Sequence, residues 1–412
     1  MRDILAPESG RWRRLTSVFA DVVEAAGYAL IIPPLMEDLN VFVRIGDATD
    51  VVTKEMYDFV DKGDRHVALR PEQTASVCRA FVEHRPTTPW KAWYSGPNFR
   101  YEKPQRGRYR QFDQVGVEVL GADDPYLDVE VIALAWEFYR RLGLQQVELK
   151  LNSLGEPDDR ARYAEALREY FTAAGDALSE QSRTTLAKNP LRVLDSKRCE
   201  DAPIVAAAPT IDEFWSDAAA EHFAAVRAGL DSLGISFTLD MKLVRGLDYY
   251  RRTTFEFAGG TLDSAQNALG GGGRYDGLVE SLGGPATPGV GFALGVDRTL
   301  LACDDEGVFA APAGDVDVFV VDTTGGAEAL AITHALRAAG LRADRAFDNR
   351  SMKSQMKAAD RSGAAVAVIV GSDELAGGVA TVRRMDHSDQ AQVTRDVLVE
   401  EVSKWLKKDQ SS

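Results

Sequence analysis

The chain has few cysteines, few histidines and no long apolar run, and each shortage argues against a class of protein. The three cysteines, Cys78, Cys199 and Cys303, are far apart and form no Cys-x-x-Cys pair, so neither a disulfide framework nor a zinc ribbon is indicated. No two of the five histidines stand at metal-ligand spacing, and we expect no metal site built from protein side chains. No run approaches the roughly 18 apolar residues that cross a bilayer, and the N-terminus lacks a signal-peptide core. We therefore expect a cytoplasmic protein with no membrane partner.

Positive charge is scarce as well, since 48 Lys and Arg residues stand against 63 Asp and Glu residues, for a formal net charge of −15. Proteins that bind nucleic acid over a broad surface usually have a basic balance. We expect any RNA contact to be confined to local basic segments. Two such segments stand out, "FRYEKPQRGRYRQF" at 99–112 and "RADRAFDNRSMKSQMKAADR" at 342–361.

The length of 412 residues and the hydrophobic content of 45% are sufficient for two or three domains. Strand-like runs dominate the first part, and a Gly-rich, strand-rich stretch follows residue 235, so we expect an α+β fold whose antiparallel sheet is flanked by helices. Ala, Glu and Arg at helical spacing predict a helical insertion, and a later βαβ alternation predicts a small α/β domain. The expected units are 1–156 (body, first part), 157–235 (helical insertion), 236–306 (body, second part) and 314–407 (C-terminal α/β domain).

Two Gly-rich segments invite comparison with nucleotide-binding loops. "GGGGRYDG" lacks the Gly-Lys-Ser/Thr ending of a phosphate-binding loop, and "GVGFALG" lacks the dinucleotide-binding spacing. We expect these glycines to permit close packing, or close approach of a ligand, in an antiparallel sheet.

A strand, loop and strand over 100–118 bring together side chains suited to a nucleotide. Arg100 and Glu102 lie on one arm, and alternation places Phe112, Gln114 and Glu118 on a single face of the other. An arginine on a rigid strand can bind a phosphate through two hydrogen bonds, and a phenylalanine can stack on a purine. A solvated basic hairpin is the alternative from these residues alone.

The stretch "LVRGLDYYRRTTFEF" at 243–257 crowds Arg245, Asp248, Tyr249 and Tyr250 into an apolar frame. It indicates either one wall of a pocket for a small, charged, flat ligand or an ordinary ion-paired hairpin. We expect the following arginines and the alternating strand to be scaffold.

Two further segments have both a functional and a structural interpretation. In "ALRPEQTASV" at 68–77, Glu72 and Thr74 follow a strand, and Thr74 could simply cap a helix. In "GVDRTLL", Arg298 begins a helix, and an ion pair with Asp297 is the simpler alternative.

These segments, in this order, resemble the histidyl-tRNA synthetases of class II. Three segments resemble the three class II motifs, of which the first builds the dimer interface. In order, they are residues 11–38, "GPNFRYEKPQRGRYRQFDQVGVEVLG" and "GVGFALGVDRTLL". "LVRGLDYY" and "GGGGRYDGLVESLGG" are similar to the histidine-specific signatures. "SMKSQMKAADRSGAAVAVIVG" is similar to the anticodon-binding domain, so the resemblance covers nearly the whole chain.

The resemblance implies an enzyme that activates L-histidine with ATP, forming histidyl-adenylate and pyrophosphate, and then transfers histidine to the 3′ end of tRNA(His). It also implies Mg²⁺ and a homodimer. The alternative is the synthetase-like regulatory subunit of ATP phosphoribosyltransferase, a binding protein that resembles the catalytic body only.

The resemblance also implies roles for individual residues. Arg245 and Arg100 would be the catalytic groups at the α-phosphate, and Glu118 with Tyr250 would bind the imidazole nitrogens. The expected histidine-binding residues are Glu72, Gln73, Thr74, Gln114, Glu118, Tyr249, Tyr250 and Tyr275. The expected ATP-binding residues are Arg100, Glu102, Arg108, Phe112, Arg245 and Arg298. The expected tRNA-binding residues are Lys103 and Gln105 at the acceptor end and Arg350 and Lys353 at the anticodon arm.

Overall fold

The computed structural model describes residues 1–44, 51–103, 105–244, 249–262, 267–312, 314, 316–387 and 389–408. Arg245 and Asp248 of the predicted site lie outside these residues. The chain divides into two compact units, one comprising Met1–Arg2 with Trp12–Ala310 and the other Asp3–Arg11 with Ala311–Ser412.

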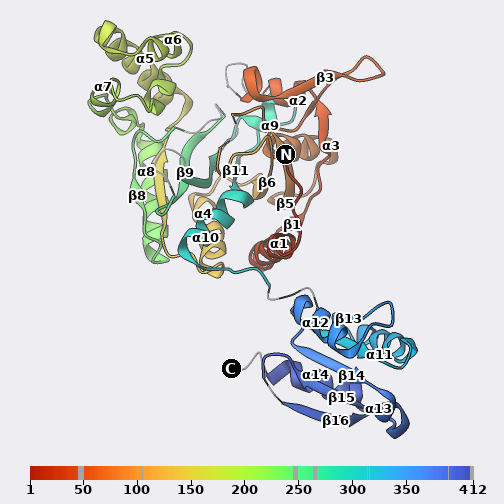
Figure 1. Ribbon diagram of the computed structural model, residues 1–412. Coiled ribbons are helices and arrows are strands. Elements are labelled where there is room, and N and C mark those ends of the chain that lie inside the picture. Colours follow the sequence, from red (N-terminus) through yellow and green to blue (C-terminus); the bar gives the residue numbers. More distant parts are fainter. Residues whose placement is uncertain are drawn as a thin grey trace. The chain divides into compact units, whose positions relative to one another are not determined.

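The larger unit is built on an eight-stranded sheet with the order β1-β5-β6-β11-β10-β9-β7-β8 (Figure 1). The strands from β5 to β7 pair antiparallel, and only the short edge strands β1 and β8 pair parallel with their neighbours. The strand bounds are β1 Ala29–Leu30, β5 Trp90–Phe99, β6 Gln111–Leu120, β7 Val147–Ser153, β8 Thr238–Leu239, β9 Arg251–Gly259, β10 Ala268–Arg274 and β11 Gly289–Gly295. The antiparallel sheet predicted from the sequence is therefore confirmed.

One face of this sheet carries the main hydrophobic core. Val115, Val117 and Val119 of β6 join a buried cluster with Phe19 and Phe138, because side chains alternate between faces along a strand. The cluster also contains residues of four helices, which are α1 Glu8–Glu24, α4 Pro125–Arg141, α8 Asp217–Ser232 and α10 Val296–Glu306. The opposite face of β6, with Gln114, Gly116 and Glu118, is left for the site.

A three-stranded antiparallel sheet with the order β2-β4-β3 precedes α3 in the chain, and β4 leads into that helix. Its strands are β2 Met36–Asp38, β3 Tyr57–Val60 and β4 His66–Leu69. The nearby helices are α2 Asn40–Val43, a π-helical turn at Val51–Glu55, α3 Thr74–His84 and α9 Leu278–Ser281. Residues of α2, α3, β4 and α9 share a buried cluster with Tyr250 and Tyr275, so this layer supports the tyrosine-bearing segments.

The segment between β7 and β8 is helical. It contains α5 Pro157–Ala174, α6 Glu180–Lys188, α7 Ala202–Ala206 and α8, with 3₁₀ turns at Gly175–Ala177, Pro190–Asp195 and Ile211–Phe214. A small core that includes Tyr163, Leu167 and Phe171 holds its first part together. Helix α8 differs, because Phe223 and Leu230 pack into the core of the main sheet. The small separate core of this segment thus lies before α8.

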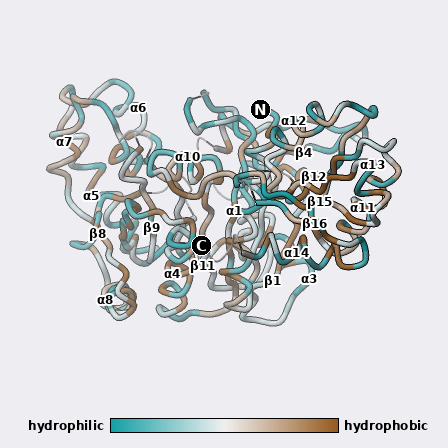
Figure 2. Tube along the Cα trace, turned by 60° about the horizontal axis from the view of Figure 1, so that its bottom comes forward, coloured by the Kyte–Doolittle hydropathy of each residue, from teal (hydrophilic) through white to brown (hydrophobic). Residues whose placement is uncertain are grey.

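The C-terminal unit is a mixed sheet with the order β13-β12-β14-β15-β16. Its first three strands pair parallel and the last two pair antiparallel. The elements are β12 Val318–Asp322, α11 Ala327–Ala338, β13 Ala343–Arg345, α12 Met352–Ser362, β14 Val366–Val370, α13 Ser372–Gly377, β15 Val379–Arg384, β16 Gln390–Thr394 and α14 Leu398–Lys408. Every residue of β12 is buried, and its apolar colour in Figure 2 is typical of a strand covered on both faces. Among the helices described in either unit, none is both long and apolar enough to cross a membrane.

Candidate active site

A cavity lies on the face of the large sheet opposite the main core. Its lining comes from the β5–β6 hairpin, the turn before α3, the residues before β9, the β10–β11 pair and the start of α10. The predicted site residues that line it are Glu72, Thr74, Arg100, Glu102, Arg108, Phe112, Gln114, Glu118, Tyr249, Tyr250, Tyr275 and Arg298. The fold thus brings together nearly all the described residues predicted to bind histidine or ATP.

Glycines of β10 and β11 let this lining come together. A Cβ on Gly291 would stand 1.9 Å from Glu118 Oε2 and 2.3 Å from the Val117 carbonyl oxygen. A Cβ on Gly272 would stand 1.9 Å from the Gly291 carbonyl oxygen. Such separations are far below van der Waals contact, so the expectation that these glycines permit close packing in an antiparallel sheet is confirmed.

Glu118 is 1% exposed and accepts three hydrogen bonds. Its Oε1 accepts from Thr74 Oγ1 at 2.7 Å and from the Tyr94 hydroxyl at 3.1 Å, and its Oε2 accepts from the Tyr275 hydroxyl. Burial raises the pKa of Glu118 to about 8, against the lowering effect of the hydrogen bonds from Tyr275 and Thr74. A buried carboxyl group with a pKa near neutrality is a strong candidate for recognising a ligand that itself exchanges protons.

Glu72 is buried at the start of α3. Its Oε2 accepts from the backbone N–H of Thr74 at 2.7 Å and its Oε1 from that of Ala75 at 2.9 Å. The carboxylate therefore accepts hydrogen bonds from the first N–H groups of the helix and caps it. The sequence pattern had indicated Thr74 as a possible cap. Burial raises the pKa of Glu72, although these N–H groups and Arg100 oppose the shift. The Thr74 hydroxyl is directed to Glu118 instead.

Three tyrosines form one wall of the cavity beside Glu118. The Tyr249 ring lies 4.8 Å from that of Tyr250 and 5.8 Å from that of Tyr275, measured between centroids. Tyr250 and Tyr275 are 8% and 1% exposed, so their positions are fixed by packing. Such a wall offers flat apolar faces and hydroxyl groups to a small ring-shaped ligand.

Cations and an aromatic ring line the other side of the cavity. Arg100 Nε donates to the Pro71 carbonyl at 2.9 Å, and the guanidinium carbon lies 5.2 Å from the centroid of Phe112. Arg298 Nη1 donates to the Ala268 carbonyl at 2.6 Å rather than pairing with Asp297, and burial lowers its pKa. A partly desolvated guanidinium is stabilised when an anion binds beside it.

Glu102 and Arg108 face each other at the same side. Glu102 Oε2 lies 3.3 Å from Arg108 Nε as an ion pair, without the geometry of a hydrogen bond. Both side chains therefore keep polar atoms that a bound ligand can engage.

Gln114 is held by Asn98, whose Nδ2 donates to Gln114 Oε1 at 2.8 Å. This contact orients the amide, and the second lone pair of Oε1 remains to accept a hydrogen bond from a ligand.

Two side chains close to the predicted residues are not among the predicted set. Tyr94 donates to Glu118, and its hydroxyl occupies space that a side chain at Gly116 would take, since a Cβ there would stand 2.5 Å from it. The pairing of β5 with β6 sets Tyr94 opposite Gly116. Asp113 also lines the cavity, and burial together with Asp297 raises its pKa to about 6. A tyrosine opposite a glycine across a hairpin is the signal that could have identified Tyr94.

Several predicted residues lie elsewhere. Gln73 is buried and does not line the cavity, and its Nε2 donates to the Gly96 carbonyl at 3.4 Å. Lys103 and Gln105 are exposed on the hairpin loop, outside the cavity. Arg350 and Lys353 are exposed in the C-terminal unit, where Arg350 Nη2 donates to Asp348 at 2.9 Å.

Known proteins match this chain over almost its whole length. Residues 1–299 match the family model for histidyl-tRNA synthetase, and residues 315–405 match the model for an anticodon-binding domain. The histidine–tRNA ligase of Rhodococcus erythropolis is 48% identical over 97% of this chain and 95% of its own length. The corresponding ligase of Halothermothrix orenii is 44% identical over 98% of each chain.

A solved structure agrees with these matches. The apo histidyl-tRNA synthetase of Staphylococcus aureus superposes with a TM-score of 0.81 and 36% sequence identity, covering 98% of both chains. On the family match over residues 1–299 and these full-length relatives, the chain belongs to the histidyl-tRNA synthetase family of aminoacyl-tRNA ligases.

Proposed function

We propose that this chain is a histidine–tRNA ligase and that the cavity holds L-histidine and ATP side by side while the adenylate forms. The observation that carries the proposal is the arrangement of Glu118 with its three hydroxyl donors at one end and Arg100 with Phe112 at the other. Family membership supports the same activity and makes ATP a substrate.

The imidazole ring of the substrate would lie against the three tyrosines, with Glu118 and Tyr250 at its two nitrogens. A carboxyl group and a phenol can each donate or accept a hydrogen bond, which suits a ring with one N–H and one bare nitrogen. An amino acid without such nitrogens would leave the remaining hydrogen-bonding capacity of the buried Glu118 unused. A site of this kind discriminates strongly against analogues that lack the groups it binds.

The α-ammonium group would bind Glu72, Thr74 and Gln114. Glu72 supplies the negative charge, and its contacts with the helix N–H groups hold that carboxylate in place. The amide of Gln114 is held by Asn98. We propose no histidine contact for Gln73, whose side chain is engaged with Gly96.

ATP would place its adenine between Phe112 and Arg298, its amino edge at Glu102 and its outer phosphates at Arg108. Arg100 would contact the α-phosphate, and Arg245, outside the described residues, is proposed to act there as well. When the histidine carboxylate attacks the α-phosphorus, charge builds on the phosphoryl oxygens, and fixed guanidinium groups lower that barrier.

We propose that Mg²⁺ enters with ATP and is held mainly by its phosphate oxygens. Among the described residues, no group of three or more His, Cys, Asp or Glu side chains is placed to hold a metal ion. A Mg²⁺ ion bound through substrate phosphates and water does not need such a cage.

The tRNA would contact both units. Lys103 and Gln105 are proposed to meet the acceptor end, because they stand on an exposed loop next to the cavity. Arg350 and Lys353 are proposed to meet the anticodon arm, which the match to an anticodon-binding domain supports. Because tRNA charging supplies translation, we propose a cytoplasmic location.

We further propose a homodimer formed through the segment that resembles the first class II motif. Four apolar side chains of this segment are exposed, and Ile32 is the most exposed of them at 81%. Neighbouring exposed apolar residues are typical of a protein interface. They are Leu30, Ile32, Leu35 and Met36.

Histidine-dependent exchange of pyrophosphate into ATP, followed by charging of tRNA(His), tests the function. The ligase predicts both activities, and omission of histidine should abolish the exchange. The regulatory subunit of ATP phosphoribosyltransferase is the alternative, and it predicts histidine binding with no exchange. That result would overturn the proposed enzyme.

A further inference from the structure

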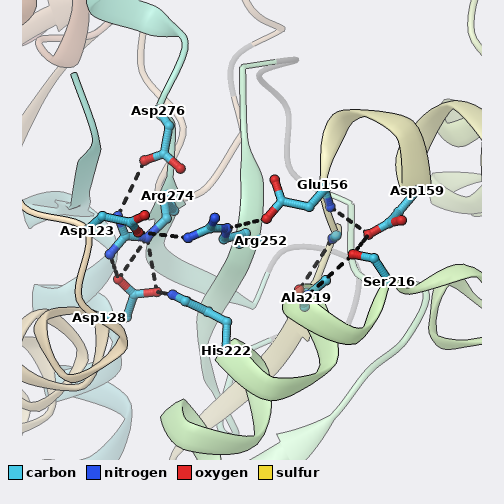
Figure 3. Close-up of polar contacts among 12 residues, drawn as sticks. Asp123, Asp128, Glu156, Asp159, Ser216, Ala219, His222, Arg252, Arg274 and Asp276 are labelled. Atoms are coloured by element: carbon cyan, nitrogen blue, oxygen red, sulfur yellow. Dashed lines mark hydrogen bonds and ion pairs between the residues drawn. The ribbon is translucent and has the colours of Figure 1, made fainter. Parts of the chain in front are cut away.

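Two arginines lie close in the chain to the tyrosines of the cavity wall, and neither lines the cavity itself. Arg274 is the last residue of β10 and precedes Tyr275, whereas Arg252 follows Tyr249 and Tyr250 by two or three positions. Figure 3 shows both guanidinium groups inside one network of carboxylates drawn from α4, the insertion and the β10–β11 turn.

Arg274 is fully buried, and acceptors surround its guanidinium group. Its Nη2 donates to Asp128 Oδ1 at 2.6 Å and to the Asp124 carbonyl at 3.1 Å, and its Nη1 donates to the Ala122 carbonyl at 3.3 Å. These bonds fix the end of β10 to the N-terminal turn of α4. A planar guanidinium with several acceptors is held in one orientation, which a lysine ammonium cannot reproduce.

The same arginine closes the turn that carries Tyr275. Arg274 Nη1 donates to Asp276 Oδ1 at 3.4 Å, and that oxygen also accepts from the Gly289 N–H at 3.1 Å. The Tyr275 N–H donates to the Gly289 carbonyl at 2.8 Å. The residues on both sides of Tyr275 are therefore anchored, and its hydroxyl is directed at Glu118.

Arg252 holds an irregular backbone next to the other two tyrosines. Its φ is +46°, in the left-handed region that non-glycine residues seldom adopt. The register of β9 with β10 shifts here, because Arg274 pairs with Arg251 whereas Gly273 pairs with Thr254. A bulge of this kind turns the preceding side chains, which here are Tyr249 and Tyr250.

Ion pairs keep this bulge in place. Arg252 Nε lies 2.6 Å from Glu156 Oε1, at the start of the insertion, and its Nη1 lies 2.7 Å from Asp123 Oδ1. Asp123 is shared, since its Oδ1 is also 3.6 Å from Arg274 Nη1. Asp128 in turn faces His222 of α8, with Nε2 3.5 Å from Oδ2. The two arginines thus form one network that reaches into the insertion.

We propose that Arg252 and Arg274 are positioning residues for histidine recognition, which set the three tyrosines against Glu118 and the substrate ring. This inference rests on the proposed function of the cavity. A network kept for stability alone would affect both substrates alike, and a buried ion pair is by itself weak evidence of stabilisation. A network that sets the tyrosines acts on histidine binding and leaves the ATP side, at Arg100 and Phe112, largely unchanged.

The test uses the full-length protein in histidine-dependent pyrophosphate exchange, with KM measured separately for histidine and ATP. Arg274→Lys keeps the charge but loses the planar group, and Arg252→Asn keeps a residue that tolerates positive φ but loses both ion pairs. We expect the KM for histidine to rise about tenfold in each and the KM for ATP to change by less than about twofold, because small misplacements at a site are costly. Arg140→Lys, on the exposed face of α4, is the control and should match the wild type.

A double-mutant cycle with Tyr275→Phe separates positioning from general damage. If Arg274 acts through Tyr275, the double variant should be hardly worse than Tyr275→Phe alone, whereas independent effects would multiply. Multiplying effects, or an equal rise in both KM values, would overturn the proposal. Should Arg274→Lys fail to fold, as judged by thermal melting, Arg252→Asn decides through its two KM values. Absence of exchange in the wild type would instead refute the proposed function, so the two failures are distinguishable.

Discussion

The hydroxyl of Thr74 donates a 2.7 Å hydrogen bond to Glu118 Oε1 and so joins the start of α3 to the C-terminal part of β6. The backbone N–H of Thr74 also donates a hydrogen bond to the carboxylate of Glu72. One threonine therefore connects the group proposed to bind the substrate ring with the group proposed to bind its ammonium. This connection fixes the spacing between Glu72 and Glu118, the two carboxyl groups proposed to bind the ends of histidine.

Replacing Glu118 with Gln should weaken histidine binding far more than ATP binding. The amide cannot accept all the hydrogen bonds of the carboxylate and leaves buried donors unsatisfied. We expect the KM for histidine to rise on the order of a hundredfold, as for other sites that lose a hydrogen-bonding group. Exchange kinetics with each substrate varied would measure it, with Glu130→Gln on α4 as the control. A parallel loss of ATP binding would contradict the assignment of Glu118 to the ring.

The raised pKa of Glu118 predicts a pH dependence of stability without ligand. Between the ordinary pKa of 4.5 and the folded value of about 8, the native state holds a proton that the unfolded state has lost. The contribution of Glu118 to the free energy of unfolding is therefore fully present below pH 4.5, and it is lost as the pH rises through 8. Between pH 6 and pH 8.5, the melting temperature of the wild type should fall by about 3 °C more than that of Glu118→Gln. Equal falls in the two proteins would show that Glu118 does not titrate in this range.

Adding a single methyl group at Gly291 should damage the histidine end of the cavity. The new Cβ would overlap Glu118 Oε2 at 1.9 Å, so either the carboxylate or the strand must move. We expect Gly291→Ala to lose at least about tenfold in kcat/KM for histidine, since small displacements at a site are costly. Gly377→Ala is a matched control, because its Cβ would meet Val379 at an ordinary 3.6 Å. Unchanged kinetics of Gly291→Ala would contradict the close approach.

Removing the Phe112 ring should affect ATP and spare histidine. Stacking of a base on an aromatic side chain contributes roughly 1–3 kcal/mol, so Phe112→Ala should raise the KM for ATP by about tenfold or more. Phe112→Tyr keeps the stacking face and should stay close to the wild type. The two KM values from pyrophosphate exchange distinguish this outcome, and a selective rise for histidine would mean that the two ends of the cavity have been assigned in reverse.

The proposed dimer can be tested at Ile32, whose side chain is 81% exposed. A charge there would be buried without a partner in an apolar interface, so Ile32→Asp should yield monomers. Light scattering coupled to size-exclusion chromatography measures the mass directly. Leu330→Asp, at a similarly exposed leucine in the C-terminal unit, is the control and should keep the mass of the wild type. A wild-type protein that runs as a monomer would refute the dimer.

Local patterns in the sequence were enough to predict the strands and much of the site. The alternation in β6 correctly placed Gln114, Gly116 and Glu118 on one face, because the period of a strand is two whatever its surroundings. The Gly-rich runs correctly indicated close approach in a sheet. The helical spacing of 157–235 likewise gave helices, although it could not show that α8 belongs to the core of the main sheet.

The sequence by itself determined the family, the elements and the kinds of side chain at the cavity, because these depend on residue type and short-range spacing. Only the tertiary structure decided which distant groups meet. Tyr275 reaches Glu118 across 157 positions, and Arg274 reaches Asp128 across 146. It also directed Gln73 to the Gly96 carbonyl and brought the Tyr94 hydroxyl to Glu118. Such contacts follow from strand order and packing, and the free energy that selects them is shared among many residues, so no short stretch of sequence can specify them.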